Sequence, residues 1–174
     1  MAKTILITGG AGFIGSHVAE ALLARGDHVV CFDNFNDFYS PKIKRANLQQ
    51  AMAHPNFSLV EADLLDREAV HQSAQGCDGI IHLAAYAGVR PSLQNPILYA
   101  RVNLEGTINV LDAARALREE GTLSNLVFAS SSSVYGINTK VPFDEEQYLG
   151  KAISPYAATK VAGTISPASM IEAE

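Results

Sequence analysis

Tyr156 and Lys160 stand four residues apart in the stretch SPYAATK, which Pro155 marks as the start of a helix. Side chains at this spacing lie on one helical face, so the ammonium can favour the phenolate form of the tyrosine. A phenolate near neutral pH can act as a general base. The serine run 130–133 precedes this pair and offers hydroxyls for the same chemistry. Together they predict a proton-transfer site, although the spacing alone is also typical of a partly buried tyrosine beside a surface lysine.

A glycine-rich turn near the N-terminus, TGGAGFIGSHVAEAL, follows an apolar run and opens a helical pattern. Gly10, Gly12 and Gly15 satisfy G-x-G-x-x-G, and Gly9, Gly12 and Gly15 satisfy the looser G-x-x-G-x-x-G. Such a turn lets the backbone approach a pyrophosphate, which the helix N-terminus binds. The pattern therefore predicts a nucleotide site, and a glycine turn without a nucleotide is the simpler alternative.

Two acidic residues follow the next two apolar runs. Asp33 lies 18 residues after Gly15, near the offset at which a carboxylate binds a ribose 2′-hydroxyl. An acid there repels a 2′-phosphate, so the sequence favours NAD over NADP. Asp63 could reach an adenine amine. Asp33 could instead be a strand-end turn former, and Asp63 a helix cap.

These residues need a scaffold that brings them together, and β-branched runs alternate with helical patterns along the chain. We expect strands at 3–8, 28–33, 57–63, 79–85 and 125–131, and helices at 13–25, 41–53, 66–75, 96–119 and 155–165. Several strands are apolar throughout, as in parallel sheets covered on both faces. The sequence predicts an α/β fold with a doubly wound parallel sheet, the Rossmann fold, whose ligands bind beyond the carboxyl ends of the strands.

Composition narrows the function classes. The chain has 48% hydrophobic and 18% charged residues, as globular proteins do, and a formal net charge of −5 that argues against nucleic acid as a partner. The densest basic stretch, KIKR at 42–45, is interpreted as a solvated helix face. Cys31 and Cys77 lie apart in apolar runs and are interpreted as buried structural thiols. Without a signal peptide or an apolar run of about 18 residues, we expect no membrane partner and a cytoplasmic location.

The ordered motifs TGGAGFIGSH, DNFNDFYSPKIKRANL, ADLLD, HLAAYAGVRPSL, NPILYARVNLEGTINVLDAAR, ASSSSVYG and SPYAATKVAG resemble the extended short-chain dehydrogenase/reductases, the NAD-dependent nucleotide-sugar epimerases and dehydratases. The resemblance covers residues 3–163. DNFNDFYSP and HLAAYAGVR are most similar to the UDP-glucuronate 4-epimerases of that family. The resemblance implies NAD as the cofactor, a UDP-sugar as the substrate, and epimerisation by transient C4 oxidation to a 4-keto sugar.

The resemblance also implies a role for each matched residue. Those assigned to the cofactor are Gly9, Gly12, Phe13, Ile14 and Gly15 at the pyrophosphate, Asp33 and Asn34 at the ribose, Asp63 and Leu64 at the adenine, Leu83, Ala84 and Ala85 at the nicotinamide side, and Asn103 beside it. Those assigned to catalysis are Ser131 as the hydroxyl, Tyr156 as the base and Lys160 as its partner and a contact of the nicotinamide ribose. Ser132 and Ser133 are assigned to the sugar, and Arg90 is either a substrate contact or a solvent-facing helix cap.

Two departures from the family pattern bear on function. Dehydratases of the family typically carry an acid pair after the catalytic hydroxyl, where this chain has Ser132 and Ser133, so an epimerase is favoured over a dehydratase or reductase relative. After residue 163 the sequence diverges, and Pro167 is expected to end the helix.

We therefore expect an NAD-binding domain at 1–163 and a divergent tail at 164–174, without the family's usual further strands and substrate domain. The alternatives are a truncated, inactive NAD-binding module and a regulatory nucleotide sensor. A homodimer through helices 96–119 and 155–165 is possible.

Overall fold

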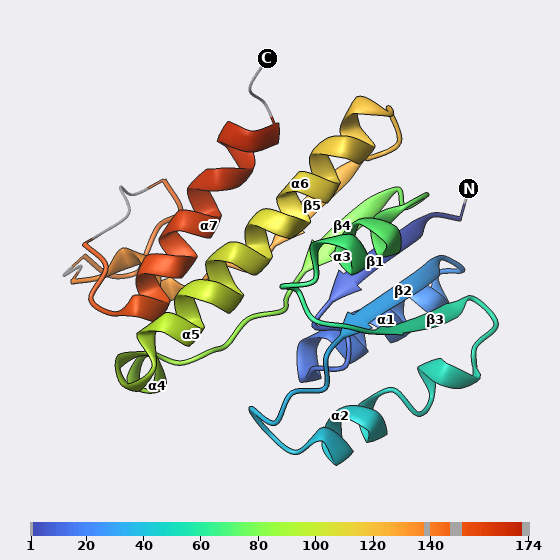
Figure 1. The fold of residues 1–174 in the computed structure, drawn as a ribbon, viewed down its shortest axis with the longest axis horizontal. Coiled ribbons are helices and arrows are strands. Elements are labelled where there is room, and N and C mark those ends of the chain that lie inside the picture. Colours follow the sequence, from blue (N-terminus) through green and yellow to red (C-terminus); the bar gives the residue numbers. More distant parts are fainter. Residues whose placement is uncertain (1, 138–139, 147–150, 172–174) are drawn as a thin grey trace.

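Five parallel strands form one sheet in the order β3-β2-β1-β4-β5. The computed structural model describes residues 2–137, 140–146 and 151–171, and for 165–171 only the course of the backbone (Figure 1). The strands are β1 (Thr4–Thr8), β2 (His28–Asp33), β3 (Phe57–Glu61), β4 (Gly79–His82) and β5 (Asn125–Phe128). The change of direction in strand order at β1 is that of a doubly wound sheet, and the predicted fold class is confirmed.

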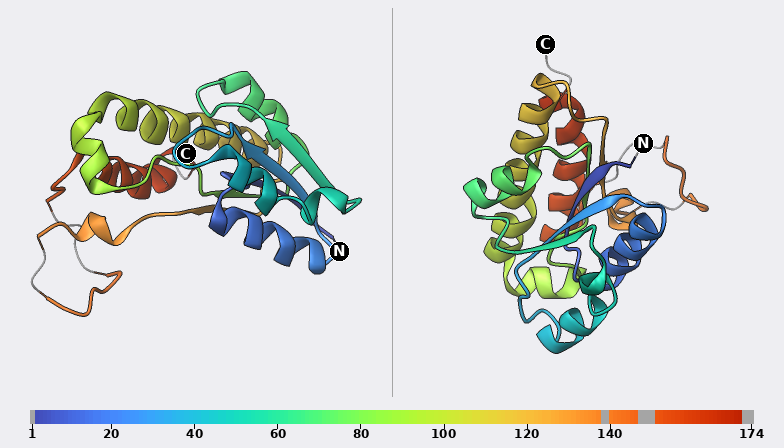
Figure 2. Two further views of the ribbon diagram at one scale, coloured as in Figure 1. Left: turned by 90° about the horizontal axis from the view of Figure 1, so that it is seen from below. Right: turned by 90° about the vertical axis from the view of Figure 1, so that its right-hand side faces the viewer.

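Helices connect successive strands and cover both faces of the sheet (Figure 2). They are α1 (Phe13–Ala24), α2 (Pro41–Asn47), α3 (Arg67–Ala74), α4 (Val89–Gln94), α5 (Pro96–Ala100), α6 (Gly106–Glu119) and α7 (Pro155–Ile171). Single turns are the 3₁₀ segments η1 (Ala51–Ala53) and η3 (Ser132–Tyr135), and a π-helical segment, η2 (Arg101–Glu105), joins α5 to α6.

Alternate residues of the central strand β1 supply the two halves of the core. Ile5 and Ile7 pack with Ala19 and Leu23 of α1 on one face. Leu6, between them, belongs to the larger cluster formed with α3 and α6 on the other face. Because all three are almost completely buried, β1 is covered on both sides, which is why it reads as a continuous apolar run.

Three strands end earlier than predicted. β3, β4 and β5 end at residues 61, 82 and 128 rather than at 63, 85 and 131. The first residues after β4 and β5 still donate to the neighbouring strand, Leu83 to the Thr8 carbonyl and Ala129 to the His82 carbonyl, whereas the Ala84 amide donates to the Thr8 hydroxyl. The carboxyl edge of the sheet is therefore lined by short loops.

The helix predictions did not include α4, and they need two further corrections. The helix expected at 41–53 ends at Asn47, and only the separate turn η1 follows. The expectation that Pro167 ends the last helix is wrong, since the backbone of α7 continues to Ile171. A proline inside a helix costs about 3 kcal/mol, and the backbone of α7 stays helical here in spite of that cost. Residues 172–174 of the predicted tail lie outside the described residues.

Two expectations about chemistry at the level of the whole chain can be compared with the structure. Both Cys31 and Cys77 are free and buried, as predicted. Within the described part of the chain, no helix has the length and hydrophobicity to cross a membrane.

Packing between α7 and the sheet depends on a glycine, which gives the first prediction. A Cβ at Gly163 would overlap the Phe128 ring, with Cε1 and Cε2 only 3.0 Å away. We expect Gly163→Ala to lower the free energy of unfolding by about 1–3 kcal/mol, because overpacking outweighs the gain of up to about 1 kcal/mol in helix propensity. Urea denaturation measures this. Ala158→Leu, which adds volume at an exposed position of α7, should stay within about 0.5 kcal/mol of wild type; equal stability of the two variants would contradict the prediction.

Candidate functional site

The glycine turn after β1 is packed too tightly for any side chain at its first position. Gly9 has a φ of +70°, and a Cβ there would lie 2.8 Å from the Ala84 nitrogen. Its amide donates to the Phe32 carbonyl at 2.8 Å. A Cβ at Gly15, in the first turn of α1, would overlap the Gly9 carbonyl oxygen. These close approaches hold the start of α1 against the ends of β2 and β4.

Gly12 leaves the beginning of α1 open. Its φ of −69° suits any residue, so backbone strain does not account for a glycine here. It is the N-cap of α1 and offers no side chain to the first amides of the helix, and the side chains of Phe13 and Ile14 are turned to solvent. Uncapped amides at the positive end of a helix form a binding site for an anion.

A phenol hydroxyl lies beside this opening. Tyr39 Oη is 3.8 Å from the place of a Gly12 Cβ, and it is buried without a hydrogen bond. Burial and the Asp33 carboxylate raise the pKa of Tyr39, so the hydroxyl keeps its proton. The nearby Phe13 amide lowers this pKa, but it lies outside hydrogen-bonding geometry. An unused buried donor next to uncapped amides fits the phosphates of a dinucleotide.

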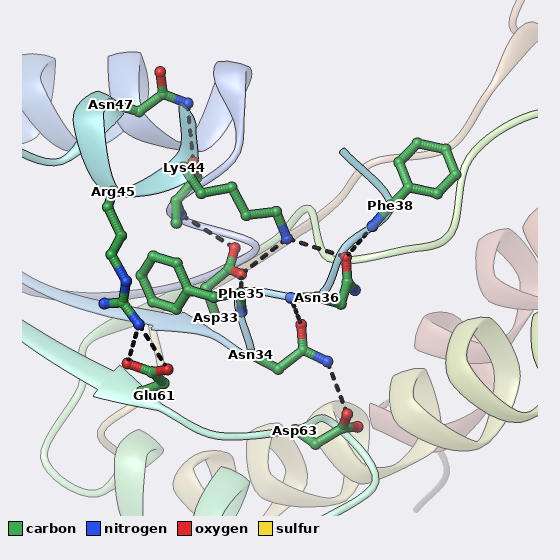
Figure 3. A network of polar contacts seen from close by, with 11 residues as sticks. Asp33, Asn34, Phe35, Asn36, Phe38, Lys44, Arg45, Asn47, Glu61 and Asp63 are labelled. Atoms are coloured by element: carbon green, nitrogen blue, oxygen red, sulfur yellow. Dashed lines mark hydrogen bonds and ion pairs between the residues drawn. The ribbon is translucent and has the colours of Figure 1, made fainter. Parts of the chain in front are cut away.

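Asp33 ends β2 and is tied on both carboxylate oxygens (Figure 3). Oδ2 accepts the Ala11 amide of the glycine turn at 3.2 Å. Oδ1 accepts the Phe35 amide at 2.8 Å and the Lys44 ammonium at 3.2 Å. Phe35 has a φ of 49°, uncommon for a non-glycine residue, and the bond to Asp33 holds it there.

Lys44 corrects one interpretation of the sequence. The KIKR stretch was expected to form a solvated helix face, and Lys42, Ile43 and Arg45 are exposed. Lys44 is instead 6% exposed and paired with Asp33.

One pocket collects most of the predicted cofactor residues. Asn34 Nδ2 donates to Asp63 Oδ2 at 2.8 Å across its floor. Predicted residues that line it are Gly9, Gly12, Asp33, Asn34, Asp63, Leu64, Leu83, Ala84 and Ala85. The sequence reasoning assigned no role to the others: Phe32, Asn36, Phe38, Tyr39, Lys44, Ala62 and Val102. Several of them lie in the motif DNFNDFYSPKIKRANL, which supported the family resemblance. The sequence reasoning gave roles only to the first two residues of that motif.

Asn103 lies behind the pocket wall. It is buried in η2, where its Oδ1 accepts the Tyr86 amide and its Nδ2 donates to the Tyr86 carbonyl and to Thr159 Oγ1. Both amide hydrogens are thus used within the protein. The Thr107 hydroxyl donates to the Asn103 carbonyl at 2.6 Å, within the π-helical segment that interrupts the predicted helix.

His82 connects this helix to the glycine turn through a directed chain of hydrogen bonds. Since the Thr107 hydroxyl donates to Asn103, it must accept from His82 Nε2, 2.9 Å away. Nδ1 therefore accepts from the Thr8 hydroxyl at 2.6 Å, and Thr8 in turn accepts the Ala84 amide. His82 is held as the neutral Nε2–H tautomer. Burial first, and the Lys160 charge second, lower the pKa of His82 to about 3.

The proposed proton-transfer residues come from adjoining elements, since α7 packs against η3. Ser131 is the N-cap of η3, and its Oγ accepts from the Ser133 amide and hydroxyl. Lys160 Nζ donates to the Ala129 carbonyl at 2.7 Å and lies 4.8 Å from the centre of the Phe128 ring, rather than bonding to Tyr156. Tyr156 is half-buried near η3.

Two further observations complete the site. Burial lowers the pKa of Lys160 to about 8, so the ammonium form still predominates at pH 7. Among the predicted substrate residues, Arg90 lies exposed at the start of α4, and Ser132 is exposed beside the half-buried Ser133. Exposure of Arg90 agrees with both of its interpretations.

Comparisons with known proteins point to one family. Residues 6–172 match the family described as GDP-mannose 4,6 dehydratase. UDP-glucuronate 4-epimerase 4 from Arabidopsis thaliana is 43% identical over 162 residues, which are 92% of this chain and 36% of the relative. This chain therefore spans little more than a third of the length of that curated relative.

Solved epimerase structures share the fold. A UDP-N-acetylglucosamine 4-epimerase from Methanobrevibacter ruminantium M1, in complex with UDP-N-acetylmuramic acid, has a TM-score of 0.87 and 31% identity over 99% of this chain and 51% of its own. A UDP-glucuronic acid 4-epimerase from Bacillus cereus, in complex with UDP-glucuronic acid and NAD, has a TM-score of 0.83 and 34% identity over 92% of this chain and 50% of its own.

The His82 chain yields a prediction about pH. Because the folded pKa lies far below the ordinary 6.5, the folded protein binds fewer protons there than the unfolded chain. The stability that His82 contributes is complete above pH 6.5 and is lost as the pH falls toward 3. In ¹⁵N NMR spectra His82 should remain the neutral Nε2–H tautomer from pH 8 to pH 5. The urea-unfolded protein is the control, in which His82 should titrate near 6.5; a midpoint near that value in the folded protein would refute the assignment.

Proposed function

This chain belongs to the GDP-mannose 4,6 dehydratase family of extended short-chain dehydrogenase/reductases. From that membership we propose that it functions as an NAD-dependent nucleotide-sugar 4-epimerase. One observation carries the proposal. The glycine turn, Asp33 and the Ser131, Tyr156 and Lys160 set all follow the carboxyl ends of parallel strands in one sheet. Ligands of such sheets bind at that edge.

The pocket residues would hold the dinucleotide. The α1 amides and the Tyr39 hydroxyl face its phosphates, Asp33 its adenosine ribose, and Asp63 its adenine. When bound, the nicotinamide supplies the oxidation and reduction of the sugar carbon. The names of the solved relatives, several crystallised with NAD, support this choice of cofactor.

The hydroxyl-bearing residues would carry the proton. Tyr156 takes the proton of the sugar 4-hydroxyl as general base, and Ser131 donates a hydrogen bond to the same oxygen. Lys160 remains a cation at pH 7 and lies one helical turn after Tyr156 on α7. Its bond to the Ala129 carbonyl fixes the ammonium at the end of β5.

UDP-glucuronate is the substrate that the comparisons favour. Curated relatives at 43–45% identity and a solved relative carry this specificity in their names. Ser132 and Ser133 replace the acid pair that a dehydratase would need, and Arg90 is available on α4 for the sugar carboxylate. An NAD-binding module without turnover is the alternative, to be decided by the assays below.

Location and assembly extend the proposal. Two free, buried thiols agree with a cytoplasmic protein. A homodimer through helices 96–119 and 155–165 stays a prediction; exposed Ile97 and Ile108 on the first of these support it, and light scattering that finds only monomer would reject it.

The first prediction from the proposed function concerns the cofactor. NAD⁺ should bind the purified chain in calorimetric titration, and Gly12→Ala should weaken binding about tenfold, because the added Cβ intrudes where a phosphate approaches the α1 amides. Ala21→Ser, which adds one atom on the exposed face of the same helix, is the matched control and should bind as wild type. Equal affinity of the two variants would reject the pyrophosphate assignment.

The second prediction concerns turnover. With NAD⁺ present, the chain should epimerise UDP-glucuronate at C4. Chromatography of the UDP-sugars measures the conversion. Tyr156→Phe should lower kcat at least about 100-fold, the usual contribution of a general base, with NAD⁺ affinity within about threefold of wild type. The control Tyr135→Phe removes the hydroxyl of a ring stacked on Phe143 and should keep activity. Binding of NAD⁺ by wild type without any turnover would instead support the inactive module.

A further inference from the structure

Lys44 places a buried positive charge in the pocket where the sequence predicted only a negative one. Its side chain is 7% exposed and that of Asp33 5%, with Nζ 3.2 Å from Asp33 Oδ1. The ammonium also donates to Asn36 Oδ1 at 3.2 Å and lies 5.4 Å from the centre of the Tyr39 ring. Both Asp33 and Lys44 line the pocket (Figure 3).

This pair changes the electrostatic argument for cofactor choice. An unpaired carboxylate at the end of β2 rejects a 2′-phosphate by repulsion, but here an ammonium in contact offsets its charge. Lys44 has three N–H donors, of which two are used by Asp33 and Asn36. What still disfavours a 2′-phosphate is the ion pair. The Lys44 ammonium could bind the phosphate, but it is already paired with the Asp33 carboxylate.

Removing the Asp33 charge should therefore do more than abolish its repulsion of a 2′-phosphate. A buried ammonium that has lost its partner is costly and favours any anion that restores the pair. The 2′-phosphate of NADP would be that anion, at the ribose that Asp33 is proposed to bind. Tyr39, whose hydroxyl has no partner, lies in the same wall.

We propose that Lys44 is a latent 2′-phosphate-binding residue and that its pairing with Asp33 sets the preference for NAD over NADP. The proposal rests on the proposed function, because it requires a dinucleotide in this pocket. It assigns the specificity to a charge pair from two elements, β2 and α2, rather than to the acid alone.

The test is a double-mutant cycle read as the ratio of the NAD⁺ and NADP⁺ dissociation constants, measured by calorimetry on the full chain. Asp33→Asn should shift the ratio toward NADP⁺ by at least about tenfold, or about 1.4 kcal/mol. Lys44→Met alone should shift it further toward NAD⁺, because the carboxylate is then unopposed. In the double variant the gain for NADP⁺ should be lost.

Two controls separate this role from a structural one. Lys42→Met removes an exposed charge two residues away on α2 and should leave the ratio unchanged. Thermal unfolding of each variant shows whether it is folded. If Asp33→Asn is not folded, the comparison of Lys44→Met with Lys42→Met still tests the claim. A purely structural loss would lower the affinities for NAD⁺ and NADP⁺ alike and leave their ratio unchanged.

The outcomes are distinct. A gain for NADP⁺ in Asp33→Asn that persists in the double variant would overturn the role of Lys44, and so would an unchanged ratio in Lys44→Met. In both cases NAD⁺ binding by wild type would leave the proposed function standing. Wild-type protein that binds neither dinucleotide would overturn the proposed function, and this inference with it.

Discussion

The Asp33 carboxylate is the group on which the candidate site depends. A buried carboxylate is tolerated only when donors replace the water that it loses, and Asp33 finds three, from the glycine turn, its own strand-end turn and α2. Each donor comes from a different segment, so satisfying one charge fixes three parts of the pocket wall. The left-handed backbone of Phe35 is part of the same arrangement. The side chain that organises this part of the fold is therefore also the one proposed to bind the ribose.

His82 fixes the β4 side of the glycine turn by hydrogen bonds, as Asp33 fixes the β2 side. Its ring joins β1, β4 and the helical run that contains Asn103, and burial keeps the ring neutral. At one end of this series of hydrogen bonds the Ala84 amide is oriented at the pocket, and at the other Thr107 donates to the carbonyl of Asn103, whose side chain bonds the Tyr86 backbone. A small set of buried polar bonds thus positions the backbone that lines the pocket.

The sequence predicted the sheet, its helices and most pocket residues because apolar runs and glycine spacing are local signals. It missed what depends on tertiary contacts. Lys44 stands among exposed neighbours, and only the return of α2 toward β2 buries it against Asp33. It also missed the π-helical turn at Asn103 and the bond between Thr107 beside it and His82 on a distant strand. The course of α7 past Pro167 shows that a cost to one hydrogen bond does not decide the end of a helix.

The two halves of the site differ in how far the described residues complete them. Around the dinucleotide pocket, carboxylate, amide and ammonium groups already bond one another, which holds these side chains in place. Around Tyr156, Ser132 and Arg90 are exposed, and Ser131 Oγ accepts hydrogen bonds from the amide and hydroxyl of Ser133. Preorganisation at a reacting centre requires a wall that excludes water. This asymmetry predicts that affinity for a dinucleotide and turnover of a sugar are separable properties, because the residues responsible for each are held by different contacts.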